Sequence, residues 1–318
     1  MTEAFAQENI TLGKTDVQIP AMGIGTWAWG GRSYWGFGQD YGEEDVRGAF
    51  DACMANGINF FDTAEIYGSG KSELLLGKFI KSTDQPVVIA TKFMPFPWRL
   101  WKGRLTAALR GSLDRLSMER VELYQVHQPY PPLPAETWAE GLAKAVEKGL
   151  TRAVGVSNYD INKMRRAESV LAAHGIPLAS NQVEYSLLNR AIEFNGLLSA
   201  CKEDQITLIA YSPLEQGLLT GKYTPDKPPP GIRGLRYRSR LLGKIQPMIR
   251  LMRGIGQAHG GRSAAQVALN WAICKGTVPI PGAKTAHQAQ ENIGALGWRL
   301  SEEEMERLDS ASQEMGTE

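Results

Sequence analysis

The sequence has few cysteines and histidines and no long hydrophobic run. Its 318 residues include three cysteines and four histidines. The cysteines, Cys53, Cys201 and Cys274, are too widely spaced for a disulfide framework or a Cys-x-x-Cys zinc site. No apolar run approaches the about 18 residues of a membrane span, and Met1 to Ile10 lacks the basic start and apolar stretch of a signal peptide. We therefore expect a cytoplasmic protein with no metal site and no membrane partner.

The chain also lacks an excess of charge of either sign. It carries 35 lysines and arginines against 34 aspartates and glutamates, a formal net charge of +1. Charged residues make up 22% and hydrophobic residues 43% of the chain, which is ordinary for a globular protein. This balance argues against disorder and against a surface that coats nucleic acid, and it suits an enzyme acting on small molecules.

Eight short β-rich segments alternate with helical segments whose apolar residues recur at i, i+3, i+4 and i+7. The expected strands are residues 22–27, 59–63, 87–93, 121–127, 152–158, 180–185, 207–213 and 277–282. Strict alternation predicts an α/β fold with parallel strands joined by right-handed crossovers. Eight regular units favour closure into a (β/α)8 TIM barrel over an open doubly wound sheet.

Some segments stand outside this repeat. Residues 11–19 indicate an N-terminal β-hairpin, residues 216–240 a long loop and residues 301–312 a terminal helix. These additions account for a length above the roughly 250 residues of a typical barrel, so we expect residues 1–318 to form a single domain. The long loop gathers four arginines that either grip a phosphate or form a solvated face: Arg233, Arg236, Arg238 and Arg240.

Three glycine-rich stretches imitate known motifs without matching them. Residues 23–28 fit a loose G-x-G-x-x-A fingerprint, but an aromatic run follows where a helix must begin. Residues 70–72 (GKS) have Glu65 where a phosphate loop needs its first glycine. Residues 155–159 (GVSNY) end in Tyr159 where a nucleophile elbow needs glycine, so Ser157 is not an acyl-transfer nucleophile.

Four polar residues stand at or just after the ends of expected strands: Asp62, Tyr67, Lys92 and His127. In a barrel these ends converge on one mouth, where polar groups are typically catalytic. A tyrosine is a poor acid at neutral pH unless a cation favours its phenolate. Lys92 supplies that cation, and Asp62 is the partner that keeps a buried lysine charged. With His127 as a hydrogen-bond donor to a carbonyl oxygen, the four residues indicate proton delivery without a metal. Taken singly, each has an ordinary structural role, as a cap, a rim aromatic, a salt bridge or a core histidine.

Further motifs surround these residues in a fixed order. They are residues 61–68 (FDTAEIYG), 90–92 (ATK), 125–127 (QVH), 155–158 (GVSN), 181–185 (NQVEY) and 280–282 (IPG). Together they resemble the aldo-keto reductases over nearly the whole chain, in particular bacterial-type members related to the potassium-channel β-subunit branch. The resemblance implies NADPH-dependent reduction of aldehydes or ketones to alcohols by hydride transfer. It makes Tyr67 the general acid, with Lys92 and Asp62 lowering its pKa and His127 orienting the carbonyl.

The resemblance also implies how a nicotinamide dinucleotide lies extended over the mouth without a Rossmann domain. Ser157, Asn158 and Gln182 look like the clamp on the nicotinamide carboxamide, and Tyr211 like the aromatic stacked on its ring. The other residues along its path are Gly25, Thr26, Trp27, Asp62, Ser212, Leu214, Gly217, Lys222, Gly282, Lys284, Gln288, Glu291 and Asn292. Lys284 would pair with a 2′-phosphate, which favours NADP over NAD, although Gln288 stands where some relatives carry arginine.

Aromatic residues after the first and third strands are expected over the same mouth, about half of them lining a substrate pocket. They are Trp29, Tyr34, Trp35, Phe96, Trp98 and Trp101. Such walls suit an apolar or aromatic carbonyl compound. The sequence leaves open which carbonyl compound is reduced and whether the protein is a monomer or a homo-oligomer.

Two other functions share parts of this pattern. A redox-sensing regulatory protein like the channel β-subunits would keep the fold, the cofactor site and the four polar residues; the lack of a long inactivation segment before the barrel argues against it. A phosphate-binding barrel isomerase or lyase would carry glycine-rich phosphate grips after the seventh and eighth strands and no tyrosine with a lysine. The sequence has that pair instead.

Overall fold

The computed structural model describes residues 9–99, 103–230, 234, 237 and 239–316. Its main sheet has eight parallel strands in sequence order, from β3 to β10. They are β3 (Ile24–Gly25), β4 (Phe60–Asp62), β5 (Val88–Phe93), β6 (Val121–Val126), β7 (Thr151–Ser157), β8 (Leu178–Glu184), β9 (Thr207–Tyr211) and β10 (Val278–Pro279). A parallel bridge between Gly25 and Gly282 joins the two edges of the sheet. The predicted (β/α)8 barrel is confirmed.

Glycine is required where the barrel closes. A Cβ on Gly25 would lie 2.8 Å from the carbonyl oxygen of Ile280. The amide of Gly25 donates to the carbonyl of Pro281, and the amide of Gly23 donates to that of Pro279. Because no side chain intervenes, the first and last strands approach closely enough for these bonds. Both strands are shorter than the predicted segments 22–27 and 277–282, since regular pairing covers two residues in each.

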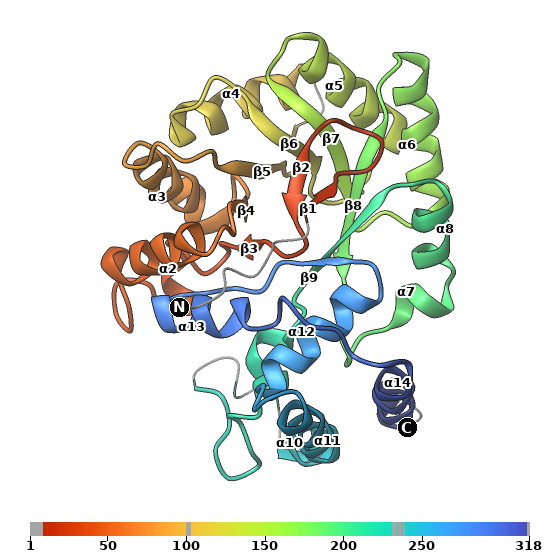
Figure 1. The fold of residues 1–318 in the computed structure, drawn as a ribbon. Coiled ribbons are helices and arrows are strands. Elements are labelled where there is room, and N and C mark those ends of the chain that lie inside the picture. The colour runs from red at the N-terminus through yellow and green to blue at the C-terminus, as the bar shows by residue number, and fades with distance from the viewer. Residues whose placement is uncertain (1–8, 100–102, 231–233, 235–236, 238, 317–318) are drawn as a thin grey trace.

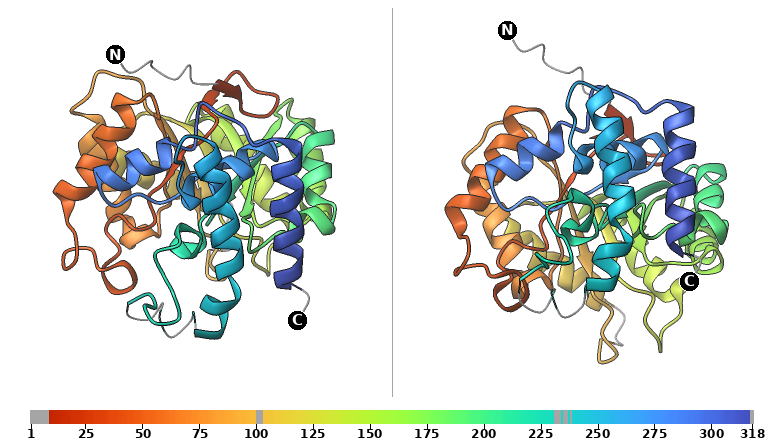
Figure 2. Two further views of the ribbon diagram at one scale, coloured as in Figure 1. Left: turned by 60° about the horizontal axis from the view of Figure 1, so that its bottom comes forward. Right: turned by 90° about the horizontal axis from the view of Figure 1, so that it is seen from below.

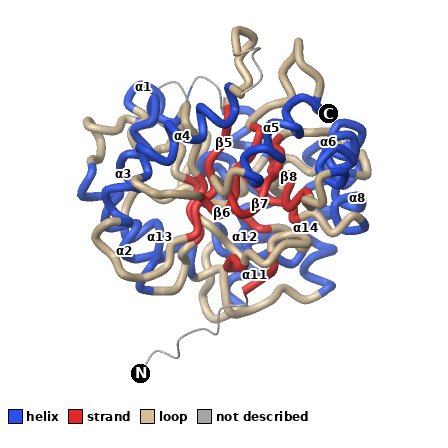
Figure 3. Tube along the Cα trace, turned by 90° about the horizontal axis from the view of Figure 1, so that it is seen from above, coloured by secondary structure: helices blue, strands red, loops and turns tan. Residues whose placement is uncertain are grey.

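Helices surround the strands in Figure 1, and Figure 3 shows the strands enclosed by them from a second direction. The helices discussed below or packed on the barrel are α1 (Arg32–Trp35), α2 (Glu43–Ala55), α3 (Lys71–Ile80), α4 (Arg104–Leu116), α5 (Ala135–Glu147), α6 (Ile161–Ala173), α7 (Ala191–Phe194), α8 (Leu197–Glu203), α10 (Ser239–Lys244), α11 (Gln246–Ala258), α12 (Ala264–Cys274), α13 (Ala286–Ile293) and α14 (Glu302–Gly316). None of the helices in the described ranges is long and apolar enough to cross a membrane.

The predicted N-terminal hairpin is present and plugs one end of the barrel. Strands β1 (Asn9–Thr11) and β2 (Gln18–Pro20) pair antiparallel. Leu12, Val17 and Ile19 from this hairpin belong to the apolar cluster inside the barrel, with Phe60 and Leu123. In Figure 2 the hairpin and the long loops lie at opposite ends of the barrel. The hairpin therefore closes the end away from the carboxyl ends of the strands.

Two predicted segments differ in detail. The long loop at residues 216–240 includes most of a 3-10 helix, η2 (Glu215–Thr220), and its last two residues begin α10. The terminal helix α14 extends four residues beyond the predicted end at residue 312. Of the four loop arginines, Arg233, Arg236 and Arg238 lie outside the described residues, and Arg240 lies in α10. The assignment of the chain to a single domain stays a prediction.

Candidate active site

Strand alternation places a polar layer directly above the apolar plug. Phe60 on β4, Ala90 on β5 and Leu123 on β6 belong to the cluster inside the barrel. Two residues further along each strand stand Asp62, Lys92 and Gln125, respectively. Because side chains repeat every second residue on one face of a strand, these three also point inward. All three are buried at the carboxyl end of the barrel.

The polar layer forms a closely connected group around Asp62. Lys92 Nζ donates to Asp62 Oδ1 at 2.5 Å and to the Thr63 carbonyl at 2.8 Å. Gln182 Nε2 donates to Asp62 Oδ2 at 2.8 Å, and Gln125 Nε2 lies 3.4 Å from the same oxygen. Asp62 therefore has polar partners on both oxygens, which offsets much of the cost of burying its charge.

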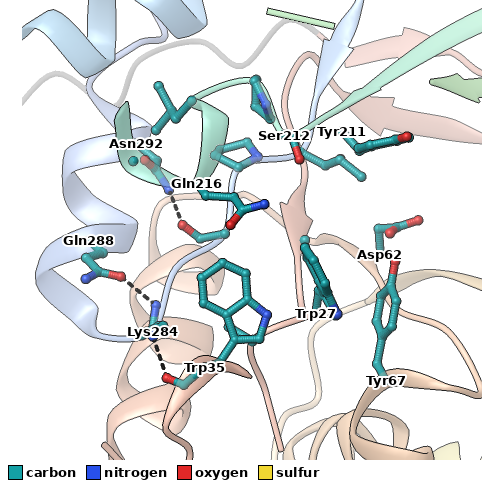
Figure 4. A pocket seen from close by; sticks show the side chains of 18 of the residues that line it. Trp27, Trp35, Asp62, Tyr67, Tyr211, Ser212, Gln216, Lys284, Gln288 and Asn292 are labelled. Carbon is teal, nitrogen blue, oxygen red and sulfur yellow. Dashed lines mark hydrogen bonds between the residues drawn. The ribbon is translucent and has the colours of Figure 1, made fainter. Parts of the chain in front are cut away.

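Tyr67 and His127 stand over this group. The Tyr67 hydroxyl lies 3.4 Å from Lys92 Nζ, and the Tyr67 and His127 rings meet edge to face with centroids 5.7 Å apart. Figure 4 shows the Tyr67 hydroxyl directed toward Asp62. The structure thus brings together the four residues that the sequence singled out at the strand ends.

The protonation state of Tyr67 differs from the sequence-based expectation. Its pKa is raised well above the usual value, first because burial disfavours the phenolate and second because the Asp62 carboxylate repels it. The expected lowering of this pKa by Lys92 and Asp62 is therefore wrong. Asp62 acts on Lys92 instead: burial lowers the pKa of the lysine, and the Asp62 charge opposes that change. Tyr67 keeps its proton at neutral pH.

His127 is neutral in the same environment. Burial and the neighbouring Lys92 charge lower its pKa to about 3. Its Nδ1 is buried and has no hydrogen-bond partner in the described part of the chain. The ring lines the cavity beside Tyr67. A neutral imidazole in this position carries one N–H that it can donate.

An elongated cavity of about 490 Å³ opens above these residues and extends to α13. It brings together 16 of the 17 residues expected along the dinucleotide path; the lining includes Gly25, Trp27, Asp62, Ser157, Asn158, Gln182, Tyr211, Ser212, Leu214, Gly217, Lys222, Gly282, Lys284, Gln288, Glu291 and Asn292. Thr26 is the exception. Its fully buried hydroxyl donates to the Asp62 carbonyl and pairs with the Ser72 hydroxyl, so it fixes the β3 end against α3.

At the inner end of the cavity, the side chains of Ser157, Asn158 and Tyr211 are held by hydrogen bonds to one another and to backbone carbonyls. Ser157 donates to the Gln182 carbonyl at 2.8 Å. Asn158 donates to the His127 carbonyl at 3.1 Å and accepts from the Tyr211 hydroxyl at 3.0 Å. Asn158 has a φ of 62°, in the left-handed region that non-glycine residues rarely adopt. This backbone strain at a strand end, held by neighbours, is typical of functional sites.

At the outer end of the cavity, Lys284 connects its own loop to the loop that follows β3. Its ammonium donates to the Trp35 carbonyl at 2.9 Å and lies over the Tyr41 ring, 4.2 Å from its centre. Gln288 accepts from the Lys284 amide at 2.9 Å, and Asn292 donates to the Gly282 carbonyl at 3.3 Å, as Figure 4 shows. Lys222 also lines the cavity, so two cations face its outer half.

The aromatic residues that were expected to line the substrate pocket lie in three different places in the structure. Trp29 does not lie over the mouth: it is fully buried against Phe61 and Phe79 and donates to the Ala283 carbonyl, because the chain turns back into the core after β3. Tyr34 stacks on Trp27 at 5.5 Å, and Trp35 meets Trp27 edge to face at 5.2 Å.

The aromatics after β5 do not reach the cavity. Phe96 and Trp98 stack on each other at 4.7 Å, with Trp98 71% exposed, and neither lines the cavity. Trp101 lies outside the described residues. Of the six expected residues, Trp35 lines the cavity and Tyr34 lies beside it.

Sequence reasoning missed several residues of the site. Gln125 was seen only as part of a motif, although it stands two residues before His127 and alternation already placed it inside the barrel. Gln216, which lines the cavity, accepts a hydrogen bond from the Tyr34 hydroxyl at 2.7 Å. Ile66, beside Tyr67, also lines the cavity. The Gln216 contact joins residues 182 positions apart, and nothing local in the sequence could indicate it.

Comparison with known proteins agrees with this geometry. Residues 21–313 match the model of the aldo/keto reductase family. The chain belongs to the aldo/keto reductase family. The chloroplastic pyridoxal reductase of Arabidopsis thaliana is 43% identical over 311 residues, covering 94% of this chain and 84% of that protein. The L-glyceraldehyde 3-phosphate reductase of Escherichia coli K12 is 31% identical over 320 residues, covering 93% and 90%.

Solved aldo-keto reductase structures share the fold. The glycerol dehydrogenase of Gluconobacter oxydans superposes with a TM-score of 0.84 at 26% identity, covering 98% of this chain and 96% of that one. An aldo-keto reductase from Klebsiella pneumoniae, solved in complex with NADPH, superposes with a TM-score of 0.76 at 28% identity, covering 96% and 95%. The resemblance predicted from the sequence motifs is confirmed.

Proposed function

We propose that this protein is an NADPH-dependent reductase of aldehydes and ketones, with Tyr67 as the general acid. The observation that carries the proposal is the meeting of Tyr67, Lys92 and His127 at the inner end of the elongated cavity, with the Tyr67 hydroxyl 3.4 Å from Lys92 Nζ. A similar protein was solved with NADPH, and another relative is a pyridoxal reductase. Pyridoxal is therefore the first aldehyde to test.

The cavity suits a nicotinamide dinucleotide. Its inner end offers amide and hydroxyl groups from Ser157, Asn158 and Gln182, which match a carboxamide, beside the ring of Tyr211. Its outer half offers Lys222 and Lys284 for phosphate charge. Gly217 has a φ of 96°, so the chain turns there without a side chain on the cavity wall. When bound, the reduced nicotinamide supplies the hydride that reaches the carbonyl carbon.

The chain's own residues deliver the proton. The neutral imidazole of His127 donates its one N–H to the carbonyl oxygen and orients it. The O–H bond of Tyr67 breaks and its proton passes to that oxygen, which becomes the alcohol hydroxyl. Lys92, at 3.4 Å, stabilises the phenolate that remains until solvent restores the proton. Asp62 holds Lys92 and Gln182 in place, since both donate to its carboxylate group.

Turnover of a panel of carbonyl compounds tests the proposal. Pyridoxal, benzaldehyde and a simple ketone are each mixed with enzyme and NADPH, and loss of the NADPH absorbance is followed. We expect NADPH oxidation matched by alcohol formation. Tight NADPH binding with no turnover of any compound would favour the redox-sensing regulatory function instead. Failure to bind NADPH would contradict both functions.

A further inference from the structure

A second hollow of about 620 Å³ adjoins the catalytic cavity. The two share Trp27, Trp35 and Ile66 as a common wall. Ile66 and Gly68, which flank Tyr67 in the chain, both line the second hollow. The second hollow therefore lies directly beside the part of the cavity wall that carries Tyr67.

The lining of the hollow is polar and carries one sign of charge. Arg32 is the charged residue among the described residues that line it, and no carboxylate is among them. The side chain of Arg32 is exposed and makes no ion pair or hydrogen bond with any described residue. The hydroxyls of Ser33 and Ser69 stand in the same lining and likewise have no partner in the described part. These are donor groups suited to an anion.

The loops after β3 and β4 are in close contact where they border the second hollow. Gly68 has a φ of 57°, and a Cβ there would lie 2.8 Å from the Gly30 backbone. The loops after β3 and β4 therefore meet where neither carries a side chain. On the other side, Trp27, Tyr34 and Trp35 contact one another with centroids 5.1 to 5.5 Å apart, and the Tyr34 hydroxyl bonds to Gln216. This aromatic group separates the hollow from the outer half of the catalytic cavity.

We propose that this hollow is a subsite for the anionic tail of the substrate, a phosphate or carboxylate at the end remote from the carbonyl group. The inference rests on the proposed reductase function and adds a substrate class to it. Arg32 supplies the charge, Ser33 and Ser69 add hydrogen bonds, and the Trp27 ring supports the connecting part of the molecule. An aldehyde with an anionic tail is then preferred over the same aldehyde with the charge masked.

Matched aldehydes test the subsite. The probes are 4-formylbenzoate against its methyl ester, and 4-formylphenyl phosphate against 4-methoxybenzaldehyde, each with saturating NADPH. The variants are Arg32→Gln, which removes the charge, and Arg32→Lys, which keeps it. Arg110→Gln on α4 is the control, because Arg110 is exposed, lines neither space and carries the same charge. Binding of the product 4-(hydroxymethyl)benzoate and its methyl ester to the NADP⁺ complex is followed by calorimetry, which needs no turnover.

We expect the wild-type enzyme to have higher kcat/KM for each anionic aldehyde than for its neutral partner. Arg32→Gln should lower that preference about 2- to 5-fold, mainly through KM, as for one exposed charge pair. Arg32→Lys should restore part of it, Arg110→Gln should keep it, and added salt should reduce it in the wild type. The product titrations should show the same order.

The two proposals fail in different ways. Absence of turnover with every aldehyde contradicts the reductase function, and the product titrations then decide the subsite alone. Turnover without a preference for the anionic aldehydes contradicts the subsite. So does a preference that Arg32→Gln leaves intact. A preference for phosphate but not carboxylate, lost in Arg32→Gln, identifies phosphate as the tail.

Discussion

At His127, burial and a nearby cation together determine the protonation state. The ring lines the cavity, its Nδ1 is buried without a partner in the described chain, and Lys92 stands nearby. Both effects disfavour the imidazolium, and the pKa falls to about 3. The histidine therefore stays neutral throughout the physiological range. Any acid limb in the activity between pH 5 and 8 has another origin.

Stability as a function of pH tests this neutral state. The unfolded histidine has a pKa of about 6.5, so the unfolded chain binds a proton that the folded chain excludes. The contribution of His127 is complete above about pH 6.5 and falls as pH decreases toward 3. Between pH 7.5 and 4.5 the free energy of unfolding should fall by about 2 to 3 kcal/mol more in the wild type than in His127→Gln. Urea unfolding of both proteins measures the difference. Equal losses would show that His127 is protonated in the folded state.

Lys284 is the residue to which NADP preference is assigned. Its ammonium already bonds to the Trp35 carbonyl and faces two aromatic rings, so it stands in a fixed position at the outer end of the cavity. Because a 2′-phosphate adds charge that NADH lacks, Lys284→Met should weaken NADPH binding about 5- to 10-fold more than NADH binding. Fluorescence titration gives both dissociation constants. A parallel loss for the two cofactors would place the 2′-phosphate elsewhere.

Among the elements, the terminal helix α14 is fastened to the barrel by a charge network. Asp309 on α14 pairs with Lys275 at 2.5 Å and accepts from Trp271 Nε1 at 2.8 Å. Arg190 donates to the Asp309 carbonyl at 2.7 Å and pairs with Glu193 at 2.7 Å. The charged side chains of this network are between 6% and 24% exposed, so solvent screens them only in part. Removing Asp309 takes one counter-charge from Lys275 and Arg190 and leaves Glu193 to pair with both.

Thermal unfolding measures the strength of this attachment. Asp309→Ala should cost about 2 to 4 kcal/mol, since Lys275 and Trp271 each lose a partner. Glu306→Ala on the same helix is the control, because Glu306 is exposed and makes no such contacts. Circular dichroism should show a clearly lower Tm for Asp309→Ala and a nearly unchanged Tm for Glu306→Ala. Equal Tm values for the two variants would mean that the network adds no stability.

The order and type of these elements could largely be predicted from the sequence. Strand segments such as residues 87–93 combine apolar alternation with flanking turn residues, and β5 begins one residue later and ends at the same residue. The ends of β3 and β10 could not be predicted, because barrel closure and not local sequence sets the extent of their pairing. The short η2 helix was also missed, since it depends on left-handed backbone at Gln216 and Gly217.

At the scale of the whole molecule, the sequence predicted which residues meet but not how each one behaves. Motifs at strand ends brought Asp62, Lys92 and His127 to one mouth, because parallel strands in a barrel end on the same side. The burial of Trp29 could not be predicted, since it depends on packing against Phe61 and Phe79. The raised pKa of Tyr67 was also missed, because it depends on how deeply the folded chain buries the hydroxyl.

The central claim is that Tyr67 gives its proton to a carbonyl oxygen beside a bound nicotinamide. Replacing Tyr67 with phenylalanine removes the hydroxyl and keeps the ring that contacts Trp27 and His127. The decisive measurement is the kcat for an aldehyde in Tyr67→Phe, taken with the NADPH dissociation constant of the same protein. We predict a kcat about 10²-fold or more below that of the wild type, as for loss of a general acid, with NADPH binding retained. A kcat close to that of the wild type would contradict the account.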